Sequence, residues 1–309
     1  MTSQNYIVSK WPARFALATL LAAIPLLALG GTVTTLEAGM AIDGWWILEP
    51  GRGDHFLLFY PLEKWFRDIG TFSEHSHRLF GVLVGNLAIA TVIATWLATK
   101  AKAARRVAFL GLFSVCFQGM IGGTRVLENS PQLAFLHGAL AQVVFAILAA
   151  SAVMLSPRFQ SSQVDDSEEA GSLARSATVA VVVTYGAIFA GAWLRHAFSH
   201  PALGVHVLLV TLAAILGFRL AGKLKAQSMD NPAKSKLRRS SIGIHALFSL
   251  QILLGVASFW VVFMMAPDSA EQVHHSAYPT MHVLVGACVL AQLVAARLWS
   301  RRTLLEQNA

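Results

Sequence analysis

Long apolar segments dominate the pattern of hydrophobic and polar positions along the chain. Each is long enough to cross a bilayer as a helix, which takes about 20 residues. Membrane barrel strands would instead alternate apolar and polar positions. Because a backbone in lipid must satisfy its own hydrogen bonds, such runs predict an α-helical bundle. We expect eight spanning helices, at residues 12–35, 78–98, 106–124, 133–155, 174–194, 201–221, 241–264 and 279–299.

The composition places the chain in the membrane class. Hydrophobic residues make up 55% of it and charged residues only 13%, whereas a soluble domain carries about a quarter charged residues. We therefore expect an all-α integral membrane protein. The two cysteines, Cys116 and Cys288, both lie within apolar runs, so we expect no structural disulfide.

The basic residues indicate an orientation. The formal net charge is +8, and 18 of the 24 Lys and Arg residues lie on the side of the predicted bundle that holds both termini. The positive-inside rule then predicts cytoplasmic termini, and it makes the basic residues 223–239 a topology signal rather than a nucleic-acid site. The segment before the first helix lacks the features of a transit peptide. We expect a bacterial cytoplasmic (inner) membrane, with the lipid bilayer as partner and no nucleic acid.

A polar, acidic stretch at residues 161–172 divides the chain into halves and is typical of a solvated linker. We place an N-terminal four-helix half at 1–157, a cytoplasmic linker at 158–173 and a C-terminal four-helix half at 174–309. The third helix of each half aligns Gln118 with Gln251 and Gly122 with Gly255. Both halves start and end on the same side, so the repeat predicts two pseudo-symmetric bundles related by an axis near the membrane normal.

Four histidines recur at one depth of the predicted bundle. Each lies within about two turns of the outer end of its helix, and three follow a proline near the expected helix start: Pro131, Pro201 and Pro279. An ionisable side chain inside a membrane span is costly, which makes it a functional candidate. The four are His77, His137, His206 and His282.

Two imidazoles on facing helices can supply both axial ligands of a heme iron. The repeat predicts one pair per half, His77 with His137 and His206 with His282. The alternative is that each histidine is hydrogen-bonded to a neighbouring helix without a ligand. Zinc is disfavoured, because no cysteine or carboxylate lies at ligand spacing.

The other histidines have different expected environments. His245 lies near the opposite end of its helix, so we interpret it as a packing or hydrogen-bonding residue. His75 points about 100° away from His77 around the helix. Solvated surface is the expectation for the histidines of outer loops and helix ends, which are His55, His196, His200, His274 and His275.

Three charged residues lie at the outer boundary beside the first pair. Glu74 shares a helix face with His77, where a carboxylate could handle protons; the alternative is a first-turn residue that complements the helix dipole. Arg78 and Arg125 either pair with heme propionates or anchor helix ends in the headgroup region.

The sequence resembles the heme A synthase family, in its bacterial form without a cysteine pair in the first outer loop. The segment EHSHRLFG (74–81) resembles the Glu-x-x-His-Arg signature of that family. Three further segments resemble its Gly-rich first-helix exit, third-helix end and fourth-helix histidine motif: GGTVTTLEAGMAIDGW (30–45), FQGMIGGTRVL (117–127) and LHGALAQ (136–142).

The resemblance implies oxidation of the C8 methyl of heme O to a formyl group, giving heme A for terminal oxidase assembly. It implies that Glu74, His77 and His137 act on the heme O substrate and that His206 and His282 hold a prosthetic heme b. Heme O would come from a farnesyltransferase partner; the electron donor is unknown, and a homo-oligomer is possible.

Some positions depart from the pattern of the family. The first Gly-rich motif continues as Asp43-Gly44-Trp45 rather than Asp-Trp-Pro, and Val207 rather than arginine follows His206, which leaves His200 as a substitute ligand. The aromatic-rich loop at 36–73 is expected to cap the substrate site and to anchor in the membrane interface. Two alternatives are a di-heme electron-transfer protein without chemistry of its own and a transporter.

Overall fold

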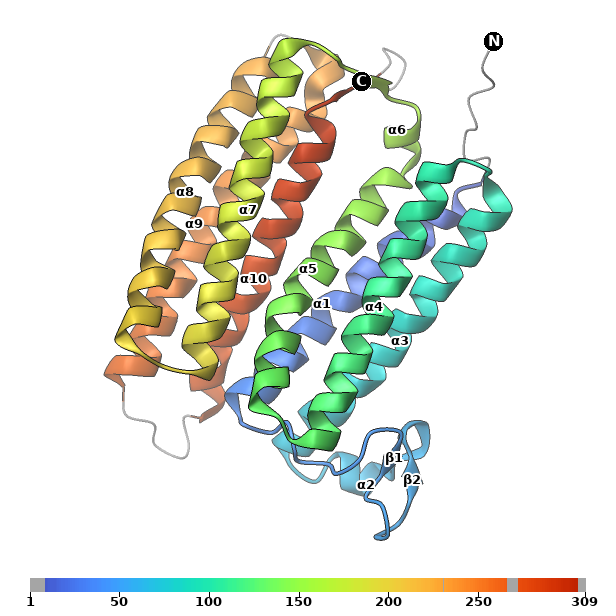
Figure 1. Ribbon diagram of the computed structural model, residues 1–309, viewed down its shortest axis with the longest axis vertical. Coiled ribbons are helices and arrows are strands. Elements are labelled where there is room, and N and C mark those ends of the chain that lie inside the picture. Colours follow the sequence, from blue (N-terminus) through green and yellow to red (C-terminus); the bar gives the residue numbers. More distant parts are fainter. Residues whose placement is uncertain (1–8, 230, 266–271, 305–309) are drawn as a thin grey trace.

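The computed structural model describes residues 9–229, 231–265 and 272–304, and this part of the chain is a bundle of long helices (Figure 1). Eight of the described helices are long and apolar enough to cross a membrane, which confirms the predicted all-α integral membrane class. They are α1 (Trp11–Thr35), α3 (Ile69–Ala98), α4 (Lys102–Glu128), α5 (Pro131–Met154), α7 (Glu168–His196), α8 (His200–Ser228), α9 (Ser235–Met264) and α10 (Gln272–Trp299).

Local capping decides where the helices begin. Ser130 caps α5 as expected, since its hydroxyl accepts the Leu133 N–H at 3.3 Å. Helix α3, however, begins at Ile69 and not near Glu74, because the Asp68 carboxylate accepts the Thr71 N–H at 2.8 Å. Glu74 therefore lies beyond the first turn of α3.

The start of α10 also differs from the expectation. Pro279 was expected near the beginning of this helix, but it lies inside α10, which already begins at Gln272. The described helix thus extends about two turns before the proline. Proline is favoured in the first turn of a helix because its missing N–H costs nothing there, whereas inside α10 it costs one backbone hydrogen bond to the preceding turn.

The helices form two groups of four (Figure 1). Helices α1, α3, α4 and α5 make the first group and α7, α8, α9 and α10 the second; α1 and α5 meet α7 and α10 where the groups join. Buried side chains of α10, Ala287 and Ala291, pack into the core of the first group beside Val84 and Phe145. The pseudo-symmetry of the complete halves and their predicted boundaries stay predictions.

The segment between the halves is folded against the end of the chain. After α6 (Pro157–Gln160), strand β3 (Gln163–Val164) pairs antiparallel with β4 (Arg302–Thr303). Asp165 forms an ion pair with Lys234 at 3.1 Å, and hydrogen bonds from Ser167 lower the pKa of the Asp165 carboxyl. Helix α7 then begins at Glu168, so the polar stretch expected to be a solvated linker partly forms a helix.

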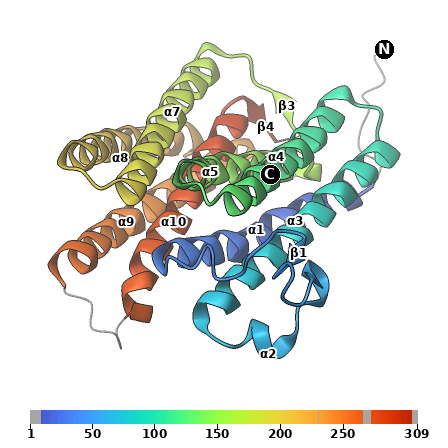
Figure 2. The ribbon, with the colours of Figure 1, turned by 60° about the horizontal axis from the view of Figure 1, so that its bottom comes forward.

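A small unit between α1 and α3 covers one end of the first helix group (Figure 2). It contains β1 (Ile47–Leu48) paired antiparallel with β2 (His55–Phe56), the 3₁₀ turn η1 (Leu57–Phe59) and α2 (Leu62–Trp65). Its buried core is made by Ile42, Leu48, Leu57 and Tyr60. We call residues 36–68 the outer unit. It lies at the opposite end of the bundle from β3 and β4 (Figure 1).

Candidate functional site

The four histidines singled out by the repeat face one another in two pairs. The ring centres of His77 (α3) and His137 (α5) are 6.2 Å apart with an interplanar angle of 79°. Those of His206 (α8) and His282 (α10) are 6.4 Å apart at 81°. The structure therefore brings together the two predicted pairs, and His206 rather than His200 faces His282.

The separation of the rings suits a shared metal ion. A metal–imidazole bond of about 2 Å on each side, with roughly 1 Å from each nitrogen to its ring centre, places two ring centres about 6 Å apart. Within the described residues no group of three or more His, Cys, Asp or Glu side chains could hold a metal ion. A metal between two imidazoles must then bring its remaining ligands with it, as the iron of a heme does.

Each of the four rings rests against a glycine of a neighbouring helix. A Cβ atom built on these glycines would lie between 2.7 and 3.1 Å from Cε1 of the facing ring, closer than ordinary van der Waals contact. Any side chain would therefore displace the ring. The glycines, in the order of His77, His137, His206 and His282, are Gly30 of α1, Gly122 of α4, Gly191 of α7 and Gly255 of α9.

The residue four positions before each glycine contacts the same ring. In the first helix of each group this contact is a main-chain carbonyl: His77 Nδ1 donates to Leu26 O at 3.0 Å, and His206 Nδ1 donates to Ala187 O at 2.9 Å. A nitrogen that donates to a carbonyl carries a proton, so the other ring nitrogen keeps a lone pair for a ligand.

In α4 and α9 the main chain of a glutamine likewise forms a hydrogen bond with the facing ring, Gln118 with His137 and Gln251 with His282. The glutamine side chains contact the same rings. Gln118 Nε2 lies 3.1 Å from His137 Nδ1 and also donates to the main-chain carbonyl of His137 at 2.7 Å. Gln251 Nε2 lies 3.3 Å from His282 Nε2. The internal repeat aligns these two glutamines, but no pattern in the sequence connects them with the histidines.

Glu74 and Arg78 join the outer unit to α3. Arg78 donates to Glu74 Oε1 at 2.6 Å, to Ile42 O at 2.9 Å and to Gly44 O at 2.7 Å. Glu74 Oε2 accepts the Ile42 N–H at 2.8 Å, and the residue is only 3% exposed. These contacts give both residues a structural task; their expected roles in catalysis and propionate binding stay predictions.

Two further arginines lie near the histidine pairs. The Arg125 guanidinium lies over Gly39 of the outer unit, and within the described residues its side chain makes no hydrogen bond or ion pair. Arg195 of α7 reaches across to α1, where it donates to Gly31 O at 2.8 Å and to the Thr35 hydroxyl. Sequence reasoning missed Arg195, because no local pattern relates positions so far apart in the chain.

Aromatic residues of the outer unit lie close to the first histidine pair. The Trp45 ring fills the space above Gly123, the neighbour of the glycine that faces His137. Trp65 Nε1 donates to Ser76 Oγ of α3 at 3.1 Å. These contacts support the expected capping of this end of the bundle, while Phe59 and Phe66 are 79% and 61% exposed and free to meet a membrane interface.

The remaining histidines lie outside the two pairs. His75 is buried against Tyr60 and Trp65 rather than directed at His77. His245 Nδ1 donates to Ser241 O at 2.9 Å, as expected of a packing residue. His55 lies 3.3 Å from Lys64 Nζ, His196 packs on Phe135 and His200 on Phe198. The side chains of His274 and His275 lie outside the described residues.

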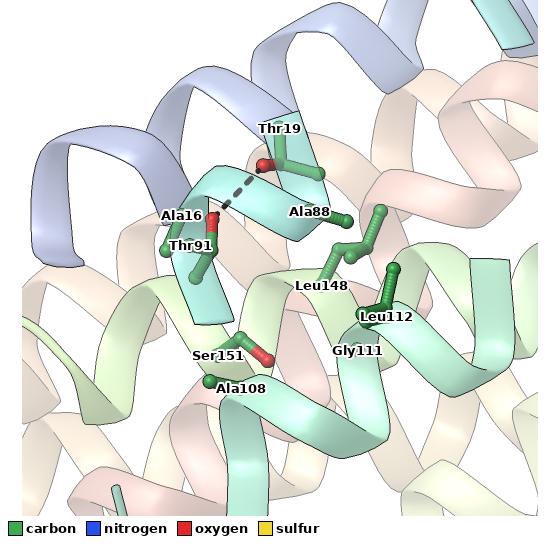
Figure 3. A pocket seen from close by; sticks show the side chains of 9 residues that line it. All are labelled: Ala16, Thr19, Ala88, Thr91, Ala108, Gly111, Leu112, Leu148 and Ser151. Carbon is green, nitrogen blue, oxygen red and sulfur yellow. Dashed lines mark hydrogen bonds between the residues drawn. The ribbon is translucent and has the colours of Figure 1, made fainter. Parts of the chain in front are cut away.

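A small cavity lies within the first helix group, and none of the residues that line it is a histidine (Figure 3). Its volume is about 10 Å³, which is about the space of one water molecule. Ala16, Thr19, Thr91 and Ser151 line it, and the Thr19 and Thr91 hydroxyls are 3.4 Å apart (Figure 3). The cavity is therefore separate from the candidate site.

Comparisons with known proteins place the chain in a family. The COX15-CtaA family, described as cytochrome oxidase assembly protein, matches residues 13–294. The chain is similar to Heme A synthase of Exiguobacterium sp., with 28% identity over 55% of this chain and 53% of that protein. It is also similar to Heme A synthase of Symbiobacterium thermophilum, with 29% identity over 56% of this chain and 60% of that protein.

These alignments span little more than half the length of the curated relatives. No solved structure gives a significant match. The family match, in contrast, extends over nearly the whole chain and includes all four paired histidines. The chain belongs to the COX15-CtaA family of cytochrome oxidase assembly proteins.

Proposed function

We propose that this protein is a heme A synthase, which oxidises the C8 methyl of heme O to a formyl group and so provides heme A for terminal oxidases. The proposal rests on the two histidine pairs. Within each pair the imidazole ring centres are 6.2 or 6.4 Å apart, a spacing that suits a heme iron bound between them. Both relatives named above are heme A synthases, which supports the same assignment.

We assign the substrate to His77 and His137, and the prosthetic heme b to His206 and His282. The outer unit supports this division, because it covers the end of the first helix group only (Figure 1). A site that performs oxidation benefits from a cover that excludes water. Arg125, whose guanidinium is unpaired within the described residues, is the cation best placed to meet a propionate of the substrate.

The proposed reaction is a four-electron oxidation of a methyl group. Heme held by the imidazoles, with dioxygen as the oxidant that takes up the four electrons, would supply the oxidising power that amino-acid side chains lack. The chain contributes two imidazoles that fix the substrate, the Trp45 cover and the Glu74 carboxylate. For Glu74 we propose proton handling or charge stabilisation; electron transfer is the role proposed for the second pair.

The cellular setting is also a proposal. We place the protein in the bacterial inner membrane with both termini in the cytoplasm. The side of the bundle that holds the termini carries the excess of Lys and Arg, and such an excess favours the cytoplasmic side. The first turns of α1 and the end of α10 lie at one end of the bundle, opposite the outer unit (Figure 1). Heme O would arrive from a farnesyltransferase partner.

The test of the activity uses cells that make heme O but no heme A. Expression of this chain should produce heme A in extracted hemes, measured by chromatography. Replacement of both His77 and His137 by alanine should abolish it while heme b stays in the purified protein. If cells carrying the wild-type chain contained an unchanged amount of heme O and no heme A, the proposal would be refuted.

A di-heme electron-transfer protein is the second candidate. It is favoured by one observation, that both oxygens of Glu74 are already bonded to Ile42 and Arg78. The substitution Glu74→Gln keeps the shape and removes the charge. Loss of heme A with heme binding intact supports the enzyme; unchanged heme A formation would exclude catalysis by Glu74.

A further inference from the structure

Arg195 lies one helical turn beyond the glycine that faces His206. The His206 ring donates to Ala187 O and rests against Gly191, and Arg195 follows Gly191 by four positions. Residues four apart lie on the same face of a helix. Helix α7 ends at the same end of the bundle as the outer unit (Figure 1). Arg195 therefore lies on the face of α7 that meets the second histidine pair, one turn nearer that end.

The guanidinium of Arg195 has most of its hydrogen-bonding capacity unused. Both of its bonds, to Gly31 O at 2.8 Å and to the Thr35 hydroxyl, come from Nη2. A guanidinium has five N–H donors, so the three on Nε and Nη1 make no hydrogen bond within the described residues, and no carboxylate there forms an ion pair with it. A cation inside a membrane bundle normally has a partner, because burying an unpaired charge is costly.

The contacts of Arg195 place it beside the second pair. Gly31 of α1, which accepts its hydrogen bond, also faces α10: a Cβ atom built on Gly31 would lie 2.9 Å from Thr280 Cγ2. Thr280 comes two residues before His282, and the positive charge of Arg195 acts on the His282 ring. The guanidinium thus lies where α1, α7 and α10 meet, close to one of the two proposed heme ligands.

The first helix group has a comparable arginine. Arg125 of α4 follows Gly122, which faces His137, by three positions, and its charge acts on both rings of the first pair. Residues three apart also share a helix face. In each group, then, one arginine lies about one turn beyond a glycine that faces a histidine ring. We have assigned Arg125 to a propionate of the substrate, and the position of Arg195 relates it to the second pair in the same way.

We propose, on the basis of the proposed function of the second pair as the heme b site, that Arg195 binds a propionate carboxylate of the heme held by His206 and His282. Heme b carries its propionates on one edge. Because charged groups are costly in the membrane interior, that edge faces the nearer polar boundary, which is the end of the bundle where α7 ends. The unused N–H groups of Arg195 then form charge-assisted hydrogen bonds to a propionate.

The test compares heme b with its dimethyl ester, in which both carboxylates are blocked. The parent protein is the full-length His77→Ala and His137→Ala double variant, purified without heme, so that the second pair is the heme site. Each heme is titrated into it, and the low-spin spectrum of iron bound by two histidines reports binding. We expect heme b to bind about 10- to 100-fold more tightly than the ester, the range for loss of a charge-assisted hydrogen bond.

Substitutions at Arg195 are then added to the parent protein. Arg195→Gln should bring the ratio of the two affinities close to one, because the cation is gone. Arg195→Lys keeps the charge on a shorter side chain without the planar fork, so the ratio should fall less. The matched control is Arg297→Gln: Arg297 also donates between helices, to the Thr178 hydroxyl at 2.9 Å, but it lies about four turns from His282 along α10. Arg297→Gln should keep the parent ratio.

A purely structural role of Arg195 predicts a different result. Loss of its bonds to α1 would weaken the binding of both hemes alike, so an unchanged ratio in Arg195→Gln overturns the inference. Equal binding of heme b and its ester by the parent protein overturns it without any substitution at Arg195. If Arg195→Gln does not fold, a lowered ratio in Arg195→Lys supports the inference and an unchanged ratio contradicts it. A parent protein that gives no low-spin spectrum with heme b instead contradicts the proposed function of the second pair.

Discussion

At the scale of single residues, the histidine pairs could be predicted and their surroundings could not. The four histidines stood out because an ionisable group recurred at one depth in alternate helices. The glycines that face them carry no such signal, since glycine is frequent in membrane helices. The contacts of Arg195 could not be predicted either, because its partners Gly31 and Thr35 lie about 160 positions away in the chain.

The glycine facing His206 offers a sharp test at this scale. In Gly191→Ala the new Cβ would lie 2.8 Å from the ring, so the ring must move. We expect heme affinity at the second pair to fall by about 10–100-fold, the usual effect of disturbing the support of a metal ligand. Heme content per protein after purification, and its release to a heme acceptor, measure the change.

The control for this substitution lies on the same helix. At Gly186 a Cβ would meet Leu209 at 3.7 Å, which is an ordinary contact. Gly186→Ala gains the same helix propensity and should keep the wild-type heme content. Equal heme content in the two variants would show that the glycine at 191 does not matter for the ring.

At the scale of elements, the apolar runs predicted the number and order of the spanning helices, but not their ends. Hydrophobicity reports only the part of a helix that lies in lipid, whereas α3 continues outward to its Asp68 cap and α7 to its Ser167 cap. The fold of the outer unit could not be predicted from the sequence either, because short strands and turns produce only a weak pattern of hydrophobic and polar positions. Its attachment to α3 through Glu74 and Arg78 depends on contacts between distant residues.

The outer unit should respond to pH through Glu49. The hydrogen bond from Lys64 lowers the pKa of the Glu49 carboxyl below its ordinary value of 4.5. A carboxyl with a lowered pKa in the folded state contributes stability above that ordinary value, and the contribution is lost as the pH falls through the folded pKa. Protection of residues 43–67 against hydrogen exchange, measured relative to the intrinsic exchange rate at each pH, should therefore decrease below about pH 4.5.

The variant Glu49→Gln supplies the comparison for that experiment. Without the carboxylate, exchange in the outer unit should be faster at neutral pH and should depend less on pH in the acidic range. Exchange within α4, which holds none of these contacts, should match the wild-type protein. An unchanged pH profile in Glu49→Gln would mean that this ion pair does not stabilise the unit.

At the scale of the whole molecule, the two helix groups carry the same histidine arrangement with different covers. The outer unit covers the end of the first group (Figure 1), and Glu74 and Arg125 lie on two helices of that group, α3 and α4. We therefore propose that the reaction takes place in the first group and that the second group holds a resident cofactor. The contact of Arg195 with α1 links the groups near both pairs, so they are expected to act as one unit.

The most direct test of this division is the heme content of three purified full-length proteins. They are the wild type, a His77→Ala and His137→Ala double variant, and a His206→Ala and His282→Ala double variant, each from cells that make heme O. We expect the first double variant to keep heme b and to lose heme O and heme A, and we expect the second to lose heme b. Loss of the same heme from both variants, or heme b bound only through His77 and His137, would contradict it.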